Sequence, residues 1–111
     1  MIPLSRADWS RVPYHLRKPL QNYVEAGQIP GRFLTGVLAD RLEMAISAAD
    51  PKGWRALQDI LAFIHLYCPP ECHGTPERVA NWEATGGLDG LAVRHHLLKA
   101  AERGEKGSPE Q

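Results

Sequence analysis

The chain lacks an excess of charge of either sign, and it lacks any long apolar run. Lysine plus arginine and aspartate plus glutamate number 13 each among 111 residues, so the formal net charge is zero. A nucleic-acid-binding domain usually carries a basic excess, so this balance argues against that class of protein. Charged residues interrupt every apolar segment before it reaches the ~20 residues that a membrane span needs. We therefore expect no membrane-spanning helix and no nucleic-acid partner.

Cysteine is also scarce, because the sequence holds only two. A disulfide framework is therefore not expected to hold the fold together. The opening residues, MIPLSRADWS, have neither the basic n-region nor the apolar h-region of a secretory signal. These features predict reduced thiols in a cytoplasmic protein. A chain of 111 residues is long enough for one domain that buries its own core.

What the sequence does contain is clear helical punctuation, above all between residues 30 and 70. Leu34, Leu38 and Leu42 recur at helical spacing and predict one helix over about residues 31–49. Asp50-Pro51 predicts the end of that helix and the capped start of the next. The second helix extends to Pro69-Pro70 and is the most apolar of the chain. We expect it to be the most buried helix, and we expect Trp54 to pack in the core.

The segment 13–27 predicts a further helix, with Pro13 near its start and Gly27 just past its end. Pro19 lies inside this segment, where proline costs ~3 kcal/mol. The helix either bends at Pro19 or starts there. We favour one bent helix because Leu16 and Leu20 continue the same apolar stripe across the proline.

The ends of the chain follow the same logic. Thr75-Pro76-Glu77 predicts a capped short helix that Gly86-Gly87 closes, and a last helix follows over about residues 88–103. We expect His95 or His96 in that helix to lie near the core. Residues 1–12 read as an extended arm whose apolar members pin it to the body: Ile2, Leu4, Trp9 and Val12. The tail 104–111 is expected to be disordered.

These elements predict a single all-α domain over residues 1–103, a compact bundle of about five helices. No segment has the period of a convincing strand, and no internal repeat is present.

Cysteine and histidine gather at the end of the apolar helix, as His65, Cys68, Cys72 and His73. Zinc prefers four such nitrogen and sulfur ligands in a tetrahedral array. Cys72 and His73 are adjacent, however, which makes joint ligation awkward, and a buried Cys68 often serves as a small apolar residue. We therefore predict no metal and no cofactor, and we keep the four residues as candidates.

Catalysis by one of these thiols has little support. Cys68 stands at the C-terminus of a helix, where the helix dipole disfavours a thiolate. Cys72 precedes a helix, but no partner base can be identified for it. We predict that the protein is not an enzyme.

A helix-turn-helix is the alternative that we keep for function. The connection between the helices at 31–49 and 51–68 has a suitable length for that motif. A recognition helix needs several basic or amide side chains on one exposed face, and the second helix offers Lys52, Arg55, Gln58 and His65. Its apolar character conflicts with a position in a DNA groove, so a DNA-binding regulator ranks second.

Between about residues 12 and 90 the chain contains the segments IPGRFLTGVLADRL, the AAD turn, LAFIHLY, CHGTPERVANW and GGL. Together these segments resemble a family of small proteins encoded by bacteriophages and prophages. The chain departs from that family at Ala39-Asp40-Arg41, where Asn-Asp is common, and at His73, where an aromatic residue is common. The resemblance implies a viral or prophage origin and expression in the cytoplasm of a bacterial host. It brings no catalytic residue with it.

The remaining class, which we favour, is a non-catalytic module that binds an unidentified protein of the host or the phage. Exposed tryptophan, tyrosine and arginine often anchor interfaces. Our candidate interaction residues are Trp9, Tyr14, Arg17, Lys18, His73 and Trp82. A homodimer through the same face is an alternative outcome.

Overall fold

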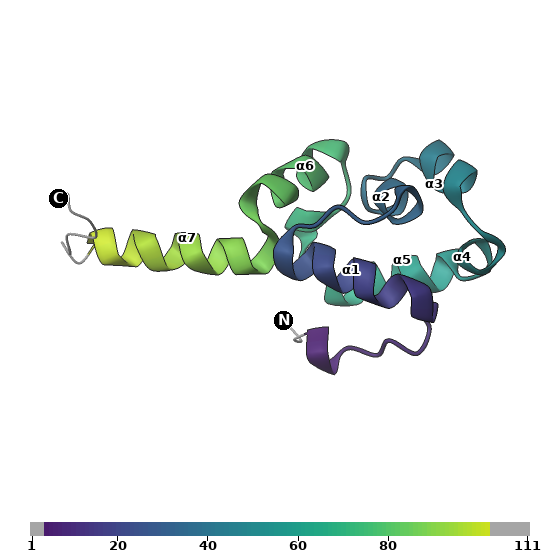
Figure 1. Ribbon diagram of the computed structural model, residues 1–111, viewed down its shortest axis with the longest axis horizontal. Coiled ribbons are helices and arrows are strands. Elements are labelled where there is room, and N and C mark those ends of the chain that lie inside the picture. The colour runs from purple at the N-terminus through teal and green to yellow at the C-terminus, as the bar shows by residue number, and fades with distance from the viewer. Residues whose placement is uncertain (1–3, 103–111) are drawn as a thin grey trace.

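A computed structural model describes residues 4–102 of the chain (Figure 1). Over that range it contains helices and turns and no strand, which confirms the all-α class. The elements are η1 (Leu4–Arg6), α1 (Tyr14–Ala26), α2 (Arg32–Leu38), α3 (Leu42–Ala48), α4 (Pro51–Arg55), α5 (Leu57–Tyr67), η2 (Pro70–Cys72), α6 (Pro76–Thr85) and α7 (Gly87–Glu102). Within residues 4–102 there are thus seven α-helices in place of the five expected. Ile2 and the tail 104–111 lie outside the described residues.

The helix α1 confirms the prediction of one helix through Pro19. It begins one residue after Pro13 and ends at Gly27, whose φ of 73° is left-handed and therefore suits glycine. Leu20, Tyr23 and Val24 face the interior and are fully buried. The apolar stripe thus outweighs the backbone hydrogen bond that Pro19 removes.

The prediction of one helix over 31–49 is wrong, because the chain breaks into α2 and α3. Asp40 between them has a φ of 58°, and the N–H of Arg41 donates a hydrogen bond to the carbonyl of Gly36 over 2.8 Å. This turn folds α3 back onto α2 so closely that a Cβ at Gly36 would lie 2.5 Å from the Ala45 nitrogen. Glycine at this crossing permits the approach. The fold-back also carries Leu42 out to the surface.

The second apolar segment is divided as well, at Ala56 between the short α4 and α5. Its start follows the prediction, since the Asp50 carboxylate accepts a 2.6 Å hydrogen bond from the N–H of Gly53. The hydrogen bond from Gly53 is the main cause that lowers the pKa of Asp50 below its ordinary value, and His15 adds to it. Inside, α5 buries Ile60, Phe63 and Ile64.

The predicted cap of α6 is present, because the Thr75 hydroxyl accepts a 3.1 Å hydrogen bond from the N–H of Arg78.

We expect Thr75→Ala to lower the free energy of unfolding by about 1 kcal/mol, since the first turn of α6 loses this acceptor. Thr75→Ser keeps the hydroxyl and should retain most of the stability. Urea unfolding followed by circular dichroism measures both variants. Equal losses in the two would contradict the role of the cap.

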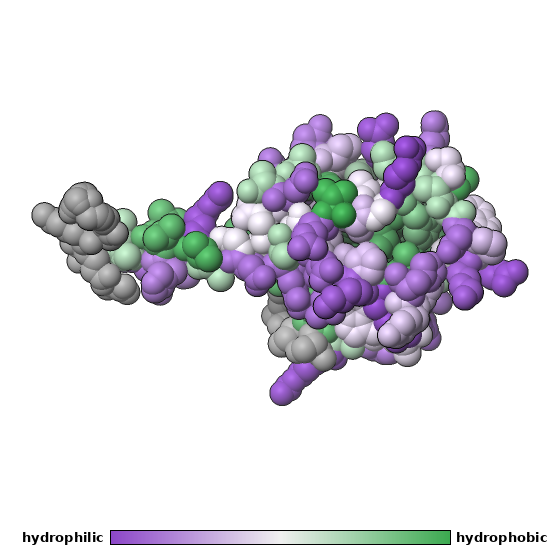
Figure 2. Space-filling view, in the orientation of Figure 1, coloured by the Kyte–Doolittle hydropathy of each residue, from purple (hydrophilic) through white to green (hydrophobic). Residues whose placement is uncertain are grey.

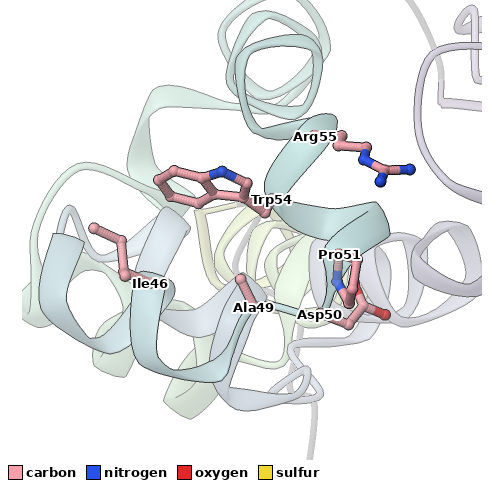
Figure 3. Close-up of a pocket in the computed structure, with 6 residues that line it drawn as sticks. All are labelled: Ile46, Ala49, Asp50, Pro51, Trp54 and Arg55. Atoms are coloured by element: carbon pink, nitrogen blue, oxygen red, sulfur yellow. The ribbon is translucent and has the colours of Figure 1, made fainter.

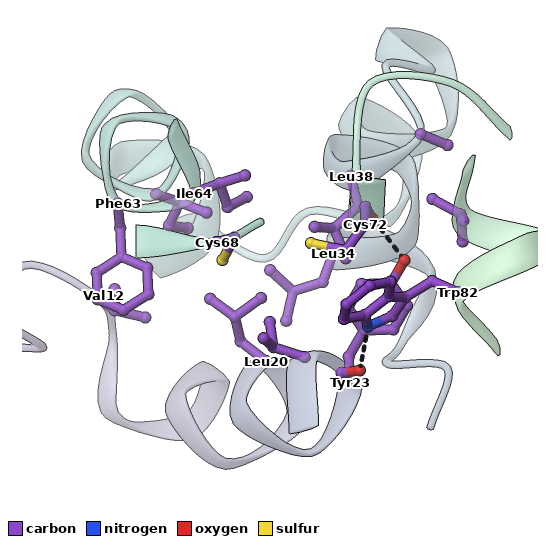
Figure 4. Close-up of a cluster of buried hydrophobic side chains, with 14 of the residues drawn as sticks. Val12, Leu20, Tyr23, Leu34, Leu38, Phe63, Ile64, Cys68, Cys72 and Trp82 are labelled. Atoms are coloured by element: carbon purple, nitrogen blue, oxygen red, sulfur yellow. Dashed lines mark hydrogen bonds between the residues drawn. The ribbon is translucent and has the colours of Figure 1, made fainter. Parts of the chain in front are cut away.

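Two buried hydrogen bonds join segments of the core that are distant in the sequence (Figure 4). The Tyr23 hydroxyl donates to the Cys72 carbonyl over 2.6 Å, and the Trp82 indole Nε1 donates to the Tyr23 carbonyl over 3.0 Å. Both side chains are buried, so these bonds satisfy their polar ends. Burial is the main cause that raises the pKa of Tyr23 above its ordinary value. α1, η2 and α6 are thereby joined around one residue.

The N-terminal arm packs on α5 through Trp9 and Val12. The Trp9 ring lies 4.4 Å from the Phe63 ring, centroid to centroid, and its Nε1 donates to the Leu4 carbonyl over 3.0 Å. Val12 is fully buried. The expected role of Leu4, Trp9 and Val12 as anchors therefore agrees with the packing.

The last helix, α7, forms where it was predicted, but it leaves the body (Figure 1). Only its start is packed, where Gly87 meets Gly27 at the end of α1. His95 and His96 are both exposed, so the expectation that one of them lies near the core is wrong. The described molecule measures 55 × 27 × 19 Å, and α7 extends along its long axis.

Candidate protein-binding groove

Two apolar stripes lie opposite each other on the surface, one on α3 and one on α4 and α5. The α3 stripe has the helical spacing i, i+4, i+7 and consists of Leu42, Ile46 and Ala49. The facing stripe consists of Trp54, Leu57 and Leu61. We call the space between these six residues the α3–α5 groove. Trp54 is 54% exposed and Ile46 is 46% exposed, so large apolar area meets water there.

α3 packs mainly against α2, which leaves part of its surface toward α4 and α5 open. Ala45 is buried on the inner side of α3, which turns the side of Leu42 and Ile46 outward. A hollow of about 420 Å³ lies beside Trp54 and Ile46, and Figure 3 shows these two side chains reaching from different helices toward it. A separate, smaller hollow of about 70 Å³ lies beside Leu42, Leu57 and Leu61 at the other end of the two stripes.

The position of Trp54 corrects the prediction that it packs in the core. Gly53 is the residue of α4 that faces inward, and a Cβ on it would lie 3.1 Å from the Phe33 ring. Because successive side chains of a helix are about 100° apart, the Trp54 side chain points away from that contact. The inward position thus belongs to Gly53 and the surface position to Trp54.

Polar groups border the groove at the Asp50 end. The His15 Nε2 lies 3.0 Å from the Asp50 carboxylate, and both side chains are about half exposed. A neighbouring hollow of about 550 Å³ is lined by Tyr14, His15, Lys52 and Arg55 among others. An apolar centre with a polar border is the usual composition of a protein-binding surface.

Of the predicted interaction residues, Tyr14, Arg17 and Lys18 lie together at the start of α1. Tyr14 is exposed and lines the hollow next to the groove. The Arg17 guanidinium donates to the Val12 carbonyl over 2.8 Å and lies 5.6 Å from the Tyr14 ring centre. Lys18 is exposed. Of these three residues, Tyr14 is the one that lines a hollow next to the groove.

The others lie elsewhere. Trp9 is half-buried against Phe63, and His73 is half-buried beside His65. Trp82 is only 3% exposed and belongs to the core, so its assignment as an interaction residue does not fit its position. Its indole N–H donates to the Tyr23 carbonyl, so burial leaves no polar atom of the ring without a partner.

The four metal candidates separate into two pairs. Cys68 and Cys72 are buried, whereas the rings of His65 and His73 meet outside at 5.3 Å between centroids. Within residues 4–102, no three histidine, cysteine or acidic side chains are placed to hold a metal ion. Burial is the main cause that lowers the pKa of His73, and the neighbouring His65 and Arg78 add to it. The carbonyl of Cys72, not its thiol, makes the bond to Tyr23.

Both thiols should be protected from thiol reagents in the folded protein. A hydrogen bond with Cys72, together with burial, raises the pKa of the Cys68 thiol above its ordinary value, and Cys72 is fully buried. Because the reactive species is the thiolate, we expect Ellman's reagent to react with both native thiols only after unfolding in guanidinium chloride. Leu66→Cys places a thiol on the surface and should react at once. Rapid reaction of the wild type would contradict this prediction.

The sequence reasoning missed Leu42, Ile46, Trp54 and Leu61 as surface residues. The sequence held one signal of this exposed apolar surface. Ile60 and Leu61 are consecutive, as are Phe63 and Ile64, so α5 is apolar on more than one side. A helix inside a small domain can bury only part of its circumference. An apolar residue beyond the buried stripe is therefore a candidate for an interface.

No helix among the described residues is both long and apolar enough to cross a membrane. No family model, curated protein or solved structure matches the chain.

Proposed function

We propose that the chain is a non-catalytic protein-binding module, which receives an amphipathic helix in the α3–α5 groove. The observation that carries this proposal is the pair of apolar stripes at helical spacing, with one hollow at each end of the space between them. A groove of this kind accepts the apolar face of a helix, with anchors at positions i, i+4 and i+7. A phage or prophage origin, which the resemblance implies, remains a prediction.

The size of the groove defines the ligand. The seven residues of α3 span ~10 Å at 1.5 Å per residue, so about two turns of a bound helix contact the stripe. Trp54 supplies the largest exposed apolar side chain of the groove, and tryptophan is enriched among the residues that dominate binding energy. We expect the ligand to place one large apolar side chain between Trp54 and Ile46.

A display library of amphipathic helical peptides tests the proposal with a defined probe. Peptides selected on the wild type should bind Trp54→Ala and Ile46→Glu at least about 30-fold more weakly, as expected for residues that dominate binding. Leu66→Glu is the matched control, because Leu66 is 71% exposed on α5 and lies outside the groove. It should bind like the wild type. Selected peptides that ignore both groove substitutions would contradict the proposal.

The helix-turn-helix alternative predicts a different result. A DNA-binding regulator would bind duplex DNA with an affinity that falls steeply as salt rises. Such binding should be weakened by Lys52→Glu and Arg55→Glu and unchanged by Ile46→Glu. We expect no DNA binding, and salt-dependent binding of that kind would favour the regulator over the groove.

A further inference from the structure

The helix α7 exposes apolar side chains along most of its length. Val93, Leu97 and Leu98 are 60%, 62% and 58% exposed, and Figure 2 shows hydrophobic surface along the projecting helix. An isolated helix of about this length is marginal in water, and helices in proteins draw their stability from packing an apolar face. A second surface that covers α7 would therefore stabilise it.

The chain itself has little with which to cover this helix. Residues 103–111 read RGEKGSPEQ and contain no large apolar side chain. The α3–α5 groove of the same molecule is out of reach, because α7 starts beside the end of α1 and runs away from the body (Figure 1). α3 and α4 lie at the opposite end of the long axis. Within residues 4–102 nothing packs on the outer part of α7, so its apolar side chains are open to a second molecule.

One face of α7 has the spacing that the groove requires. Val93, Leu97 and Ala100 stand at positions i, i+4 and i+7, so they form one stripe on one side of the helix. The two larger side chains are more than half exposed, and Ala100 allows close approach at the end of the stripe. A second copy of the chain could thus place its α7 in the groove of the first copy and accept the α7 of the first copy in its own groove.

We propose that the chain forms a homodimer in which α7 of each copy occupies the α3–α5 groove of the other. This proposal rests on the proposed function, because it names the occupant of the same groove. The groove and α7 lie at opposite ends of the long axis. In the proposed dimer a twofold axis relates the two copies, so that both grooves are filled. Such an arrangement closes on itself, whereas a one-way contact would continue into a filament.

Light scattering coupled to size exclusion tests the proposal on the full chain over a range of concentrations. We expect a dimer for the wild type and a dissociation constant at least about 30-fold higher for Leu97→Glu and for Ile46→Glu. Leu66→Glu should remain dimeric. Leu97 lies outside the core, so its substitution leaves the body folded, which circular dichroism checks. A wild type that stays monomeric at every concentration would overturn the proposal.

A mixture of the two variants separates groove exchange from direct pairing of two α7 helices. The Ile46→Glu copy keeps its helix and the Leu97→Glu copy keeps its groove, so the mixed pair retains one of two contacts. We expect more dimer in the mixture than in either variant alone. If α7 paired with α7, Ile46→Glu alone would dimerise like the wild type, and that result would overturn the proposal.

Cross-linking then locates the contact. A bismaleimide should join Leu97→Cys of one chain to Ile46→Cys of another, whereas the native cysteines are buried. Cross-links between two copies of Leu97→Cys and none to Ile46→Cys would contradict the exchange. The peptide experiment distinguishes the two proposals, because a monomeric chain that still binds helical peptides at Trp54 overturns the homodimer and leaves the proposed function intact.

Discussion

Replacing Trp82 with alanine is expected to lower the free energy of unfolding by about 3–5 kcal/mol. The Trp82 side chain is 3% exposed and fills the space between α6 and α1, so its removal leaves a cavity. The Tyr23 carbonyl also loses its 3.0 Å hydrogen bond from the indole. Since domains of this kind are stable by only about 5–15 kcal/mol, the variant should lose a large part of its stability.

Urea unfolding followed by circular dichroism measures the loss, and Trp54→Ala is the matched control. That substitution removes the same side chain from a position that is 54% exposed, so we expect a loss of about 1 kcal/mol or less. Trp82→Phe keeps much of the volume without the N–H, and should fall between the wild type and Trp82→Ala. Equal losses at positions 54 and 82 would contradict the assignment of core and surface.

Replacing Gly87 with alanine should be nearly as damaging. A Cβ at Gly87 would lie 2.5 Å from the Gly27 nitrogen and 2.7 Å from the Ala26 nitrogen, both of them backbone atoms that cannot move aside easily. The φ of Gly87 is 69°, which adds a conformational penalty of about 1–2 kcal/mol for a residue with a side chain. With the steric cost of overpacking, we expect a total loss of about 2–5 kcal/mol.

Thermal and urea unfolding measure this loss, and Gly31→Ala is the control. Gly31 has a φ of −60°, and a Cβ there meets nothing within 4 Å. Gly31 is also the N-cap of α2, where alanine is less favourable than glycine, and this cost offsets the gain in chain entropy. We therefore expect Gly31→Ala to change stability by less than about 1 kcal/mol. If Gly87→Ala were equally harmless, the close contact between α1 and the start of α7 would be wrong.

The ends of several helices could be predicted from the sequence because their causes are local. Asp50 and Thr75 accept hydrogen bonds from N–H groups three residues later, and Gly27 and Gly86 adopt left-handed conformations just after their helices. Each of these signals lies within one turn of the boundary that it marks. No knowledge of the tertiary fold is needed to interpret them.

The break at Asp40 could not be predicted in the same way. The leucine stripe continues from Leu34 through Leu38 to Leu42, and nothing near Asp40 ends it. The turn depends instead on the close approach of Gly36 to Ala45, a contact between two helices. Sequence periodicity detects the apolar stripe but cannot show that the chain folds back in the middle of it.

The groove was missed for the same reason. Composition and spacing do not tell which tryptophan is buried, because Trp54 and Trp82 both stand on helical stripes. Two contacts determine which tryptophan is buried. Phe33 packs against Gly53, and the Trp82 indole donates to the Tyr23 carbonyl, so each contact joins segments that are distant in the sequence. The existence of α7 follows from its residues, whereas its exposure depends on what the rest of the chain leaves uncovered.

The hydrogen bond from Trp82 to Tyr23 has a consequence for synthesis of the chain. The two residues are 59 positions apart, so α1 leaves the ribosome well before its partner in α6 exists. At about 5–20 residues per second, the interval is on the order of 3–12 seconds. During that time the inward face of α1 has only part of its final cover. A nascent chain that is halted before residue 82 should therefore be bound by chaperones, and one that has extended well past it should be released.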